Sequence, residues 1–161
     1  MKSFPHFFIK FSIIISISIS VFLFSCDNKT VYKEFIKFPD LEWAKNDIKT
    51  FIFENTDDVS KVDVYLAFRY AQGFQFDIML FSVIEKSPVG NFPYPISIQI
   101  KDDNGKYIGE GSGDIWDIEI PIKQNVSLAK GTYRYEISSN MPLQKLNMIM
   151  EVGLIIKKSN Q

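Results

Sequence analysis

The chain has 161 residues, 18 Lys and Arg against 19 Asp and Glu, one histidine and one cysteine. Its length suits a single domain of ordinary size, and its slightly acidic balance argues against a nucleic-acid partner, which needs a basic face. His6 and Cys26 both belong to the first 26 residues. The remainder therefore has no side chains for a Cys-His or Ser-His-Asp nucleophile, a Cys/His zinc site or a disulfide.

Residues 1–25 are predicted to be a lipoprotein signal peptide. Lys2 and Lys10 precede an apolar run that ends at Phe24. The run is shorter than the about 20 residues of a membrane-spanning helix and fits the roughly 7–15 residues of a signal peptide. It closes on LFSC, which is typical of bacterial lipoprotein cleavage before the cysteine. We therefore expect Cys26 to begin the mature chain and to hold it on a membrane by attached lipid. An uncleaved anchor helix is the alternative.

Removal of this leader changes the chemistry of the chain. It takes away Lys2 and Lys10, so that Lys and Arg fall from 18 to 16 against 19 Asp and Glu, and the net charge becomes −3. It also takes away His6. Only carboxylates, lysines, tyrosines and backbone groups are then left as chemical players, and we predict no catalytic residue, cofactor or metal.

The rest of the chain is predicted to be extended. Residues 26–40 are expected to form a lipidated tether and a first edge strand, residues 41–158 a β-sandwich domain, and residues 159–161 a frayed tail. Leu41–Ala44 is too short to be more than a helical turn. Thr50–Glu54 resumes an extended pattern that ends at the turn-forming sequence NTDD.

Two longer segments predict strands of the core. From Val62 to Tyr70 apolar and other residues alternate, which indicates a strand with one buried face. Phe76–Ile84 is apolar at both parities and predicts a central strand that is buried on both faces. Ser87–Pro95 holds three prolines and predicts a loop.

The C-terminal half continues the same pattern. Asn104-Gly105 suits a type I′ hairpin turn, since both central positions of that turn need φ > 0. Trp116–Ile122, Thr132–Ser138 and Leu146–Ile156 are predicted to be extended. With roughly eight to ten strands and no convincing amphipathic helix, we predict an all-β fold, an antiparallel two-sheet β-sandwich.

Two motifs in this half resemble ligand loops and fail on context. The segment GEGSGD, residues 109–114, lacks GxGxxG spacing and a following Gly-Lys-Ser/Thr. Its alternate glycines instead predict bulges or a close approach of two backbones. Asp102 and Asp103 begin like a calcium loop, but the glutamate at EF-hand spacing is missing, which favours the hairpin.

Carboxylates and aromatic residues close to this segment keep two other functions open. Asp117 and Glu119 would share a strand face at about 6–7 Å, with Asp114 nearby, and a carboxylate-based hydrolase needs such a pair in a cleft. Trp116 and Tyr107 would serve a sugar or a protein partner if their rings were exposed. Solvated acids and core aromatics are the plainer interpretations.

The order and spacing of several segments are similar to one known family. The chain resembles the GldH family of gliding-motility lipoproteins from Bacteroidota in these segments: Cys26-Asp27 with Val31-Tyr32 and Trp43 following, NGKYIGEGSGDIWD from Asn104, GTYRYEIS from Gly131 and MEVGLII from Met150. It departs from the family pattern at Tyr107, where we expect Trp, at Pro142, where we expect Arg, and at residues 73–76, which replace a Tyr-Pro-rich turn.

The resemblance implies an outer-membrane lipoprotein, held on the periplasmic side, that supports the gliding apparatus or its associated secretion machinery. It implies no enzymatic activity, and its partners would be other envelope proteins. A carbohydrate-binding module that uses Trp116 is the alternative of a different class. A glycan array with the wild type and Trp116→Ala separates the two, because equal absence of binding removes the sugar hypothesis.

Overall fold

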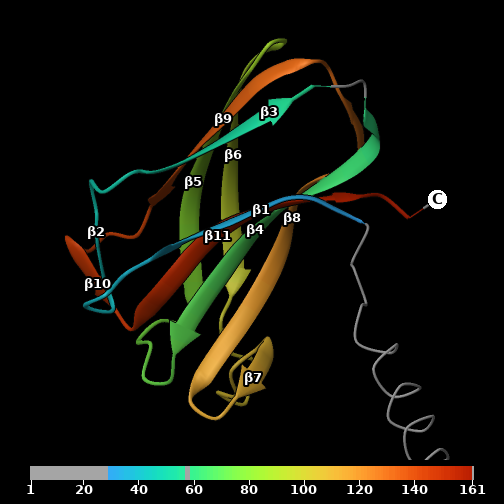
Figure 1. The fold of residues 1–161 in the computed structure, drawn as a ribbon. Coiled ribbons are helices and arrows are strands. Elements are labelled where there is room, and N and C mark those ends of the chain that lie inside the picture. The colour runs from blue at the N-terminus through green and yellow to red at the C-terminus, as the bar shows by residue number, and fades with distance from the viewer. Residues whose placement is uncertain (1–28, 57–58, 161) are drawn as a thin grey trace, which may run out of the picture.

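The computed structural model describes residues 29–56 and 59–160, and all regular structure in these residues is β-strand. Two antiparallel sheets pack face to face, with a short two-stranded ribbon at one side (Figure 1). The predicted antiparallel two-sheet sandwich is thereby confirmed. The described part has eleven strands, because three segments of only three residues each add to the longer ones. The predicted signal peptide and Cys26 lie outside the described residues.

The first layer is a five-stranded sheet. Its strands, in spatial order, are β1 (Thr30–Lys37), β11 (Ile149–Lys158), β4 (Val59–Ala71), β8 (Ile115–Leu128) and β7 (Glu110–Ser112). No helix in the described part of the chain is long and apolar enough to cross a bilayer.

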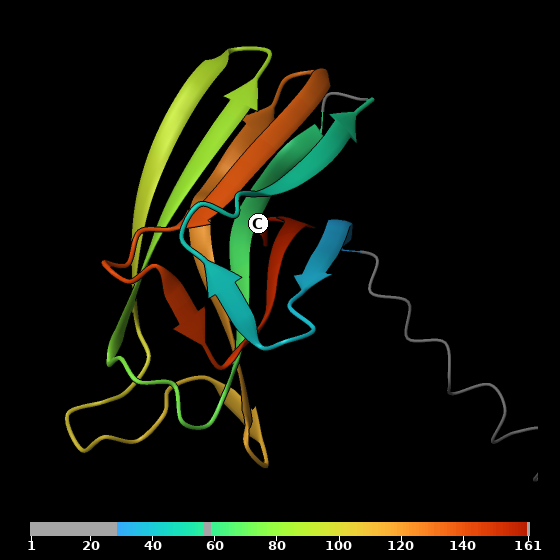
Figure 2. The ribbon, with the colours of Figure 1, turned by 90° about the vertical axis from the view of Figure 1, so that its left-hand side faces the viewer.

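The second layer is a four-stranded sheet, and the ribbon closes one side of the sandwich. The sheet runs in the order β3 (Lys49–Asn55), β9 (Gly131–Ser139), β5 (Ile78–Ser87) and β6 (Gly90–Gln99). The ribbon pairs β2 (Glu42–Ala44) with β10 (Lys145–Asn147). Figure 2 shows the two layers from the side, with the β5–β6 hairpin at one margin.

The central strand β4 confirms the predicted alternation. Its inward residues are at most 1% exposed: Val62, Val64, Leu66, Phe68 and Tyr70. Cross-strand neighbours on β11 and β8 supply the rest of this inner surface. Burial of one face of a strand in this way is worth about 1.5–3 kcal/mol for each large apolar side chain.

The strand β5 corrects one expectation. It lies inside the four-stranded sheet, as predicted, but only one of its faces is buried. Met79, Phe81 and Val83 point into the core, whereas Ile78 is 46% and Leu80 36% exposed. The prediction of burial on both faces is wrong because no element in the described residues packs on the outer face of this sheet (Figures 1 and 2).

The ribbon and the β6 strand correct two further expectations. Residues 42–44 form a strand rather than a helical turn, because Trp43 is fully buried against Phe38 and Phe81 at ring-centroid distances of 4.9 and 5.9 Å. Pro93 and Pro95 lie within β6 rather than in a loop. An edge strand tolerates proline, since an N–H that points away from the sheet needs no partner.

The Asn104-Gly105 turn exists but is not the predicted type I′. Gly105 has φ +76°, and Asn104 is not among the residues with positive φ. Instead the carboxylate of Asp102 accepts hydrogen bonds of 2.9 Å from the backbone N–H groups of Asn104 and Lys106. This Asx-type turn uses the Asp side chain in place of a left-handed Asn.

Candidate functional site: a charged groove on the five-stranded sheet

The outer face of the five-stranded sheet carries a row of charged residues that crosses all its strands. In the ladder register Lys37 lies opposite Glu151, Glu151 opposite Arg69, Arg69 opposite Asp117, and Asp117 opposite Glu110. Residues directly opposite each other in an antiparallel pair have side chains in contact. The strand pairing, rather than any local motif, therefore brings five charges from five strands into one line.

Arg69 lies at the centre of this row and is bound on both sides. Its Nε and Nη2 donate to the two carboxylate oxygens of Asp117 at 2.7 and 3.0 Å, which is a bidentate pair. Its Nη1 donates to Glu151 at 3.3 Å. A planar guanidinium suits this fork geometry, so the three side chains are held in fixed positions on a rigid strand.

A second pair lies one row further along the same face. Lys157 Nζ is 2.6 Å from Glu119 Oε2, and the ammonium also lies 5.1 Å from the centre of the Tyr65 ring. Nearby, hydrogen bonds from Ser159 Oγ and the Asn125 backbone N–H hold the pKa of the Asp63 carboxyl below its ordinary value.

Small residues and a cluster of acids make this face a groove. A depression of about 560 Å³ is lined by Gly109, Glu110, Asp117, Ile118, Glu119 and Lys157. A neighbouring one of about 440 Å³ also has Glu110 and Asp117 in its lining and reaches Arg69. We call the surface formed by Arg69, Glu110, Asp117, Glu119 and Lys157 the charged groove.

Two glycines of the GEGSGD segment allow β7 to approach β8 closely. Gly109 has φ +120°, and a Cβ there would lie 2.4 Å from the carbonyl oxygen of Asp117. A Cβ at Gly111 would lie 2.4 Å from the ring of Trp116. The predicted close approach of two backbones is confirmed. A phosphate loop requires a helix after its glycines, and no helix follows Gly113 in the described chain.

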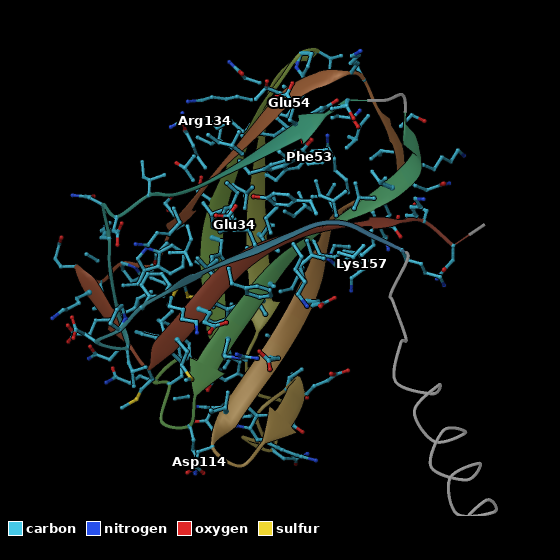
Figure 3. The ribbon with its side chains drawn as sticks, in the orientation of Figure 1. Glu34, Phe53, Glu54, Asp114, Arg134 and Lys157 are labelled. Carbon is cyan, nitrogen blue, oxygen red and sulfur yellow. The ribbon has the colours of Figure 1, made fainter. Side chains whose placement is uncertain are left out.

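The three predicted carboxylates separate into two places. Asp117 and Glu119 do share the outer face of β8, but each is bound to a different cation, Arg69 or Lys157. Asp114 lies in the turn between β7 and β8, at the far end of the sheet (Figure 3). The acid pair of a hydrolase needs one free nucleophile or base, and the ion pairs occupy both candidates on this strand.

The two aromatic residues that the sequence singled out lie beside β7, where Trp116 is opposite Gly111. Trp116 and Tyr107 are half-buried, with ring centroids 5.7 Å apart, and both pack against the core. The Tyr107 hydroxyl accepts a hydrogen bond of 2.8 Å from the Gly73 N–H. The Trp116 Nε1–H is buried without a hydrogen-bond partner. A role for these rings in binding a partner or a glycan stays a prediction.

Another ion pair lies inside the sandwich. Glu85 of β5 is fully buried, and Lys123 of β8 approaches its carboxylate oxygens to 2.6 and 2.8 Å. Burial, and after it the neighbouring Glu85, raises the pKa of the Tyr135 hydroxyl. Lys123 Nζ also lies 5.7 Å from the Tyr94 ring centre. The pair links the two sheets and is enclosed by aromatic rings.

Sequence reasoning missed Arg69 and Lys157, although it named their partners. The only local signal was the polar alternation of β4, in which Arg69 occupies the face opposite the core residues. Lys157 stands next to Lys158, and nothing in the sequence distinguishes one of these two lysines from the other. Within the described residues, no group of three or more His, Cys, Asp or Glu has the geometry of a metal site.

Comparison with known proteins identifies the family of the chain. Residues 30–156 match the family model described as GldH lipoprotein. The chain belongs to the GldH lipoprotein family. The resemblance noted in the sequence is therefore confirmed, and the segment Asn104–Asp117 on which it partly rests contributes Glu110 and Asp117 to the charged groove.

Two curated relatives span nearly the whole chain. A gliding motility lipoprotein GldH homolog of Christiangramia forsetii is 27% identical over 159 residues, which cover 93% of this chain and 97% of the relative. The gliding motility lipoprotein GldH of Flavobacterium johnsoniae is 27% identical over 149 residues, covering 88% and 92%. Among solved structures, the GH115 4-O-methyl-α-glucuronidase BtGH115A aligns with 84% of this chain and 18% of its own at 16% identity. Its TM-score of 0.42 is too low to bear on function.

Proposed function

We propose that this GldH-family protein is a non-enzymatic lipoprotein of the outer membrane, on its periplasmic side, that supports gliding or the associated secretion machinery through protein contacts. The family and its named relatives support a role in gliding motility. The contact surface is the charged groove.

One observation carries the choice of surface. The groove presents both signs of charge at fixed positions on a packed sheet, with Arg69 held by Asp117 and Glu151. Side chains that are already positioned lose little conformational freedom when a partner binds, and complementary charges set its orientation. Glu110 is exposed at the rim of the groove and is available to a partner cation.

The same ion pairs argue against catalysis in this groove. A general acid or base needs a carboxyl group that is free to exchange a proton with substrate. Asp117 is held bidentately by Arg69, and Glu119 is held by Lys157. These acids serve as fixed charges for recognition.

Attachment through a lipidated Cys26 would place the domain close to the membrane. Cys26 is four residues before Thr30, where β1 begins. An extended chain spans at most about 3.6 Å per residue, so β1 would begin within about 14 Å of the lipid. Metabolic labelling with a fatty acid should mark the wild type and leave Cys26→Ala unlabelled, and equal labelling would refute the anchor.

The motility role is tested by deleting the gene and complementing it with groove variants. Deletion should stop gliding or the associated secretion, and intact gliding and secretion in the deletion strain would end the proposal. Complementation with Glu110→Lys should restore the protein level but reduce both gliding and the envelope proteins that cross-link to it in intact membranes. Asp103→Lys, a charge change of the same size at an exposed residue in the turn before β7, is the matched control and should restore both.

A further inference from the structure

The outer face of the four-stranded sheet exposes large apolar side chains beside a small set of paired charges. Five of its large apolar side chains are exposed to 36–56%: Ile48, Ile52, Ile78, Leu80 and Ile84. They come from β3, β5 and the residue before β3, and no described element covers them (Figure 2). The three on β5 adjoin the exposed Pro93 and Pro95 of β6, whereas the polar outward residues of β9 separate them from Ile48 and Ile52. Apolar side chains that gather on one part of a surface in this way mark interaction sites.

The charges on this face cancel within the face itself. Glu136 of β9 accepts from Lys86 at 2.7 Å and from Arg134 at 3.0 Å, and Glu54 accepts from Thr132 at 2.6 Å. Two cations and two carboxylates therefore leave no net charge; Figure 3 labels Arg134 and Glu54 on the side away from the five-stranded sheet. A strongly acidic or basic partner gains nothing here, and a second identical face is not repelled.

The β6 edge of the sheet is closed to a further strand. Asn140 N–H donates to Leu80 C=O at 2.9 Å, so that the backbone groups of Leu80 point to β9 and those of its neighbours alternate. By this alternation the backbone groups of Val83 point to β6, where its partner is Tyr94. Pro93 and Pro95 occupy the positions of β6 whose N–H would point to the free edge, and proline there blocks the addition of another strand.

The relief of the face complements itself. Along β5 the outward residues run Leu80, Ser82, Ile84, and Ser138 of β9 lies opposite Ser82. The two serines thus form a low place on the face, and on β5 it lies between the larger Leu80 and Ile84. A two-fold axis that passes between Ser82 and Ile84, across the strands, places Ile84 of each copy over Ser82 of the other. Contacts of this reciprocal kind are the mark of an isologous dimer.

The size of the face is sufficient for a dimer. Four strands about 4.8 Å apart, each with about eight residues at about 3.3 Å, cover a footprint of roughly 500 Å² before the side-chain relief is counted. A standard interface needs about 800 Å² of accessible surface from each partner. Side chains that project from the sheet raise the accessible area above the flat footprint, which brings two such faces into this range.

We infer that the protein forms a two-fold dimer by packing the outer face of the four-stranded sheet, centred on Ser82 and Ile84, against the same face of a second copy. The two charged grooves then face away from each other, and each dimer carries two membrane tethers. This inference goes beyond the proposed motility role and does not depend on it.

Cross-linking in intact membranes tests the dimer. The chain has one cysteine, so that Ser82→Cys adds one thiol at the centre of the face. Facing sheets lie about 10 Å apart, which suits a short bis-maleimide rather than a direct disulfide. Ser82→Cys should give a cross-linked dimer, whereas the wild type and Lys33→Cys, a control on the other sheet, should not. Dimer yield from Ser82→Cys no greater than from Lys33→Cys overturns the inference.

A second variant keeps the result specific. Ile84→Asp added to Ser82→Cys should lower the dimer yield at least tenfold, because a carboxylate at the centre of the interface must be desolvated. Ile108→Asp, at a similarly exposed residue outside the face, should leave the yield unchanged. Circular dichroism checks that both variants are folded. A dimer that persists with folded Ile84→Asp, or a cross-link from Ser82→Cys only to a different protein, contradicts the choice of a second copy.

Discussion

The two outer faces of this sandwich expose different kinds of side chains to their surroundings. Both sheets bury one face in a shared core and expose the other. The five-stranded sheet covers its outer face with charges joined across strands, centred on Arg69. The four-stranded sheet leaves isoleucines and serines on its outer face and pairs its few charges locally around Glu136. A charged, recessed face suits directional recognition, and a face without net charge that exposes apolar side chains suits packing against another sheet.

The largest expected effect comes from the close contact that shapes the groove. Gly109→Ala should destabilise the fold by about 3 kcal/mol, because a left-handed φ and a contact of 2.4 Å with the Asp117 carbonyl act together. Gly73→Ala is the control, since Gly73 has φ +96° and open space around its Cβ position; it should cost about 1 kcal/mol. Urea unfolding measures both, and equal losses would mean that β7 moves freely away from β8.

The arginines of the two faces provide a direct comparison. Arg69→Met should lower stability by about 2 kcal/mol, between the values for exposed and buried ion pairs. Asp117 loses its bidentate partner, and Glu151, whose side chain is only 13% exposed, keeps only the exposed Lys37 at 3.8 Å. Arg134→Met on the other face should cost less than about 0.5 kcal/mol, since Lys86 still pairs with Glu136. Thermal unfolding distinguishes them, and similar losses would remove the difference between the two faces.

Acid should reduce the stability that one carboxylate on each face contributes to the fold. Hydrogen bonds from Ser159 to Asp63 and from Lys86 to Glu136 hold both pKa values below the ordinary 3.8 and 4.5. Because the folded pKa is depressed, each group stabilises the fold above its ordinary pKa, and this stability is lost as the pH falls through the folded value. Asp63→Asn and Glu136→Gln should each flatten the loss of stability below about pH 4.5. Urea unfolding between pH 3 and 7 checks this, and an unchanged acid slope in both variants would contradict it.

The smallest effect is expected on the apolar face. Ile52 is 56% exposed, so Ile52→Thr should change the stability of the isolated chain by less than about 0.5 kcal/mol. The measurement is urea unfolding at low protein concentration. A loss above about 1 kcal/mol would show that Ile52 is buried in solution. Folding would then be linked to association through this face, which would sharpen the contrast between the two outer faces.

Prediction from the sequence succeeded where local pattern and packing agree. The alternation of β4 marks its buried face, because a strand of period two can bury only one set of side chains against a single neighbouring layer. It failed for β5, where an apolar run suggested two covered faces and the fold provides one. The ribbon strand β2 was missed because three residues are too few to show the alternation of a strand. The position of Trp43 is set by its contacts with Phe38 and Phe81.

The sequence by itself determined the all-β class, the strand of the central core and the family, because alternation and segment order are properties of the chain alone. It also predicted a lipid anchor at Cys26, which remains to be tested. Only the tertiary structure decided that Asp117 meets Arg69, 48 residues away, and that two chemically different faces result. Antiparallel register joins residues that are distant in the chain, and neither composition nor spacing specifies which strands become neighbours.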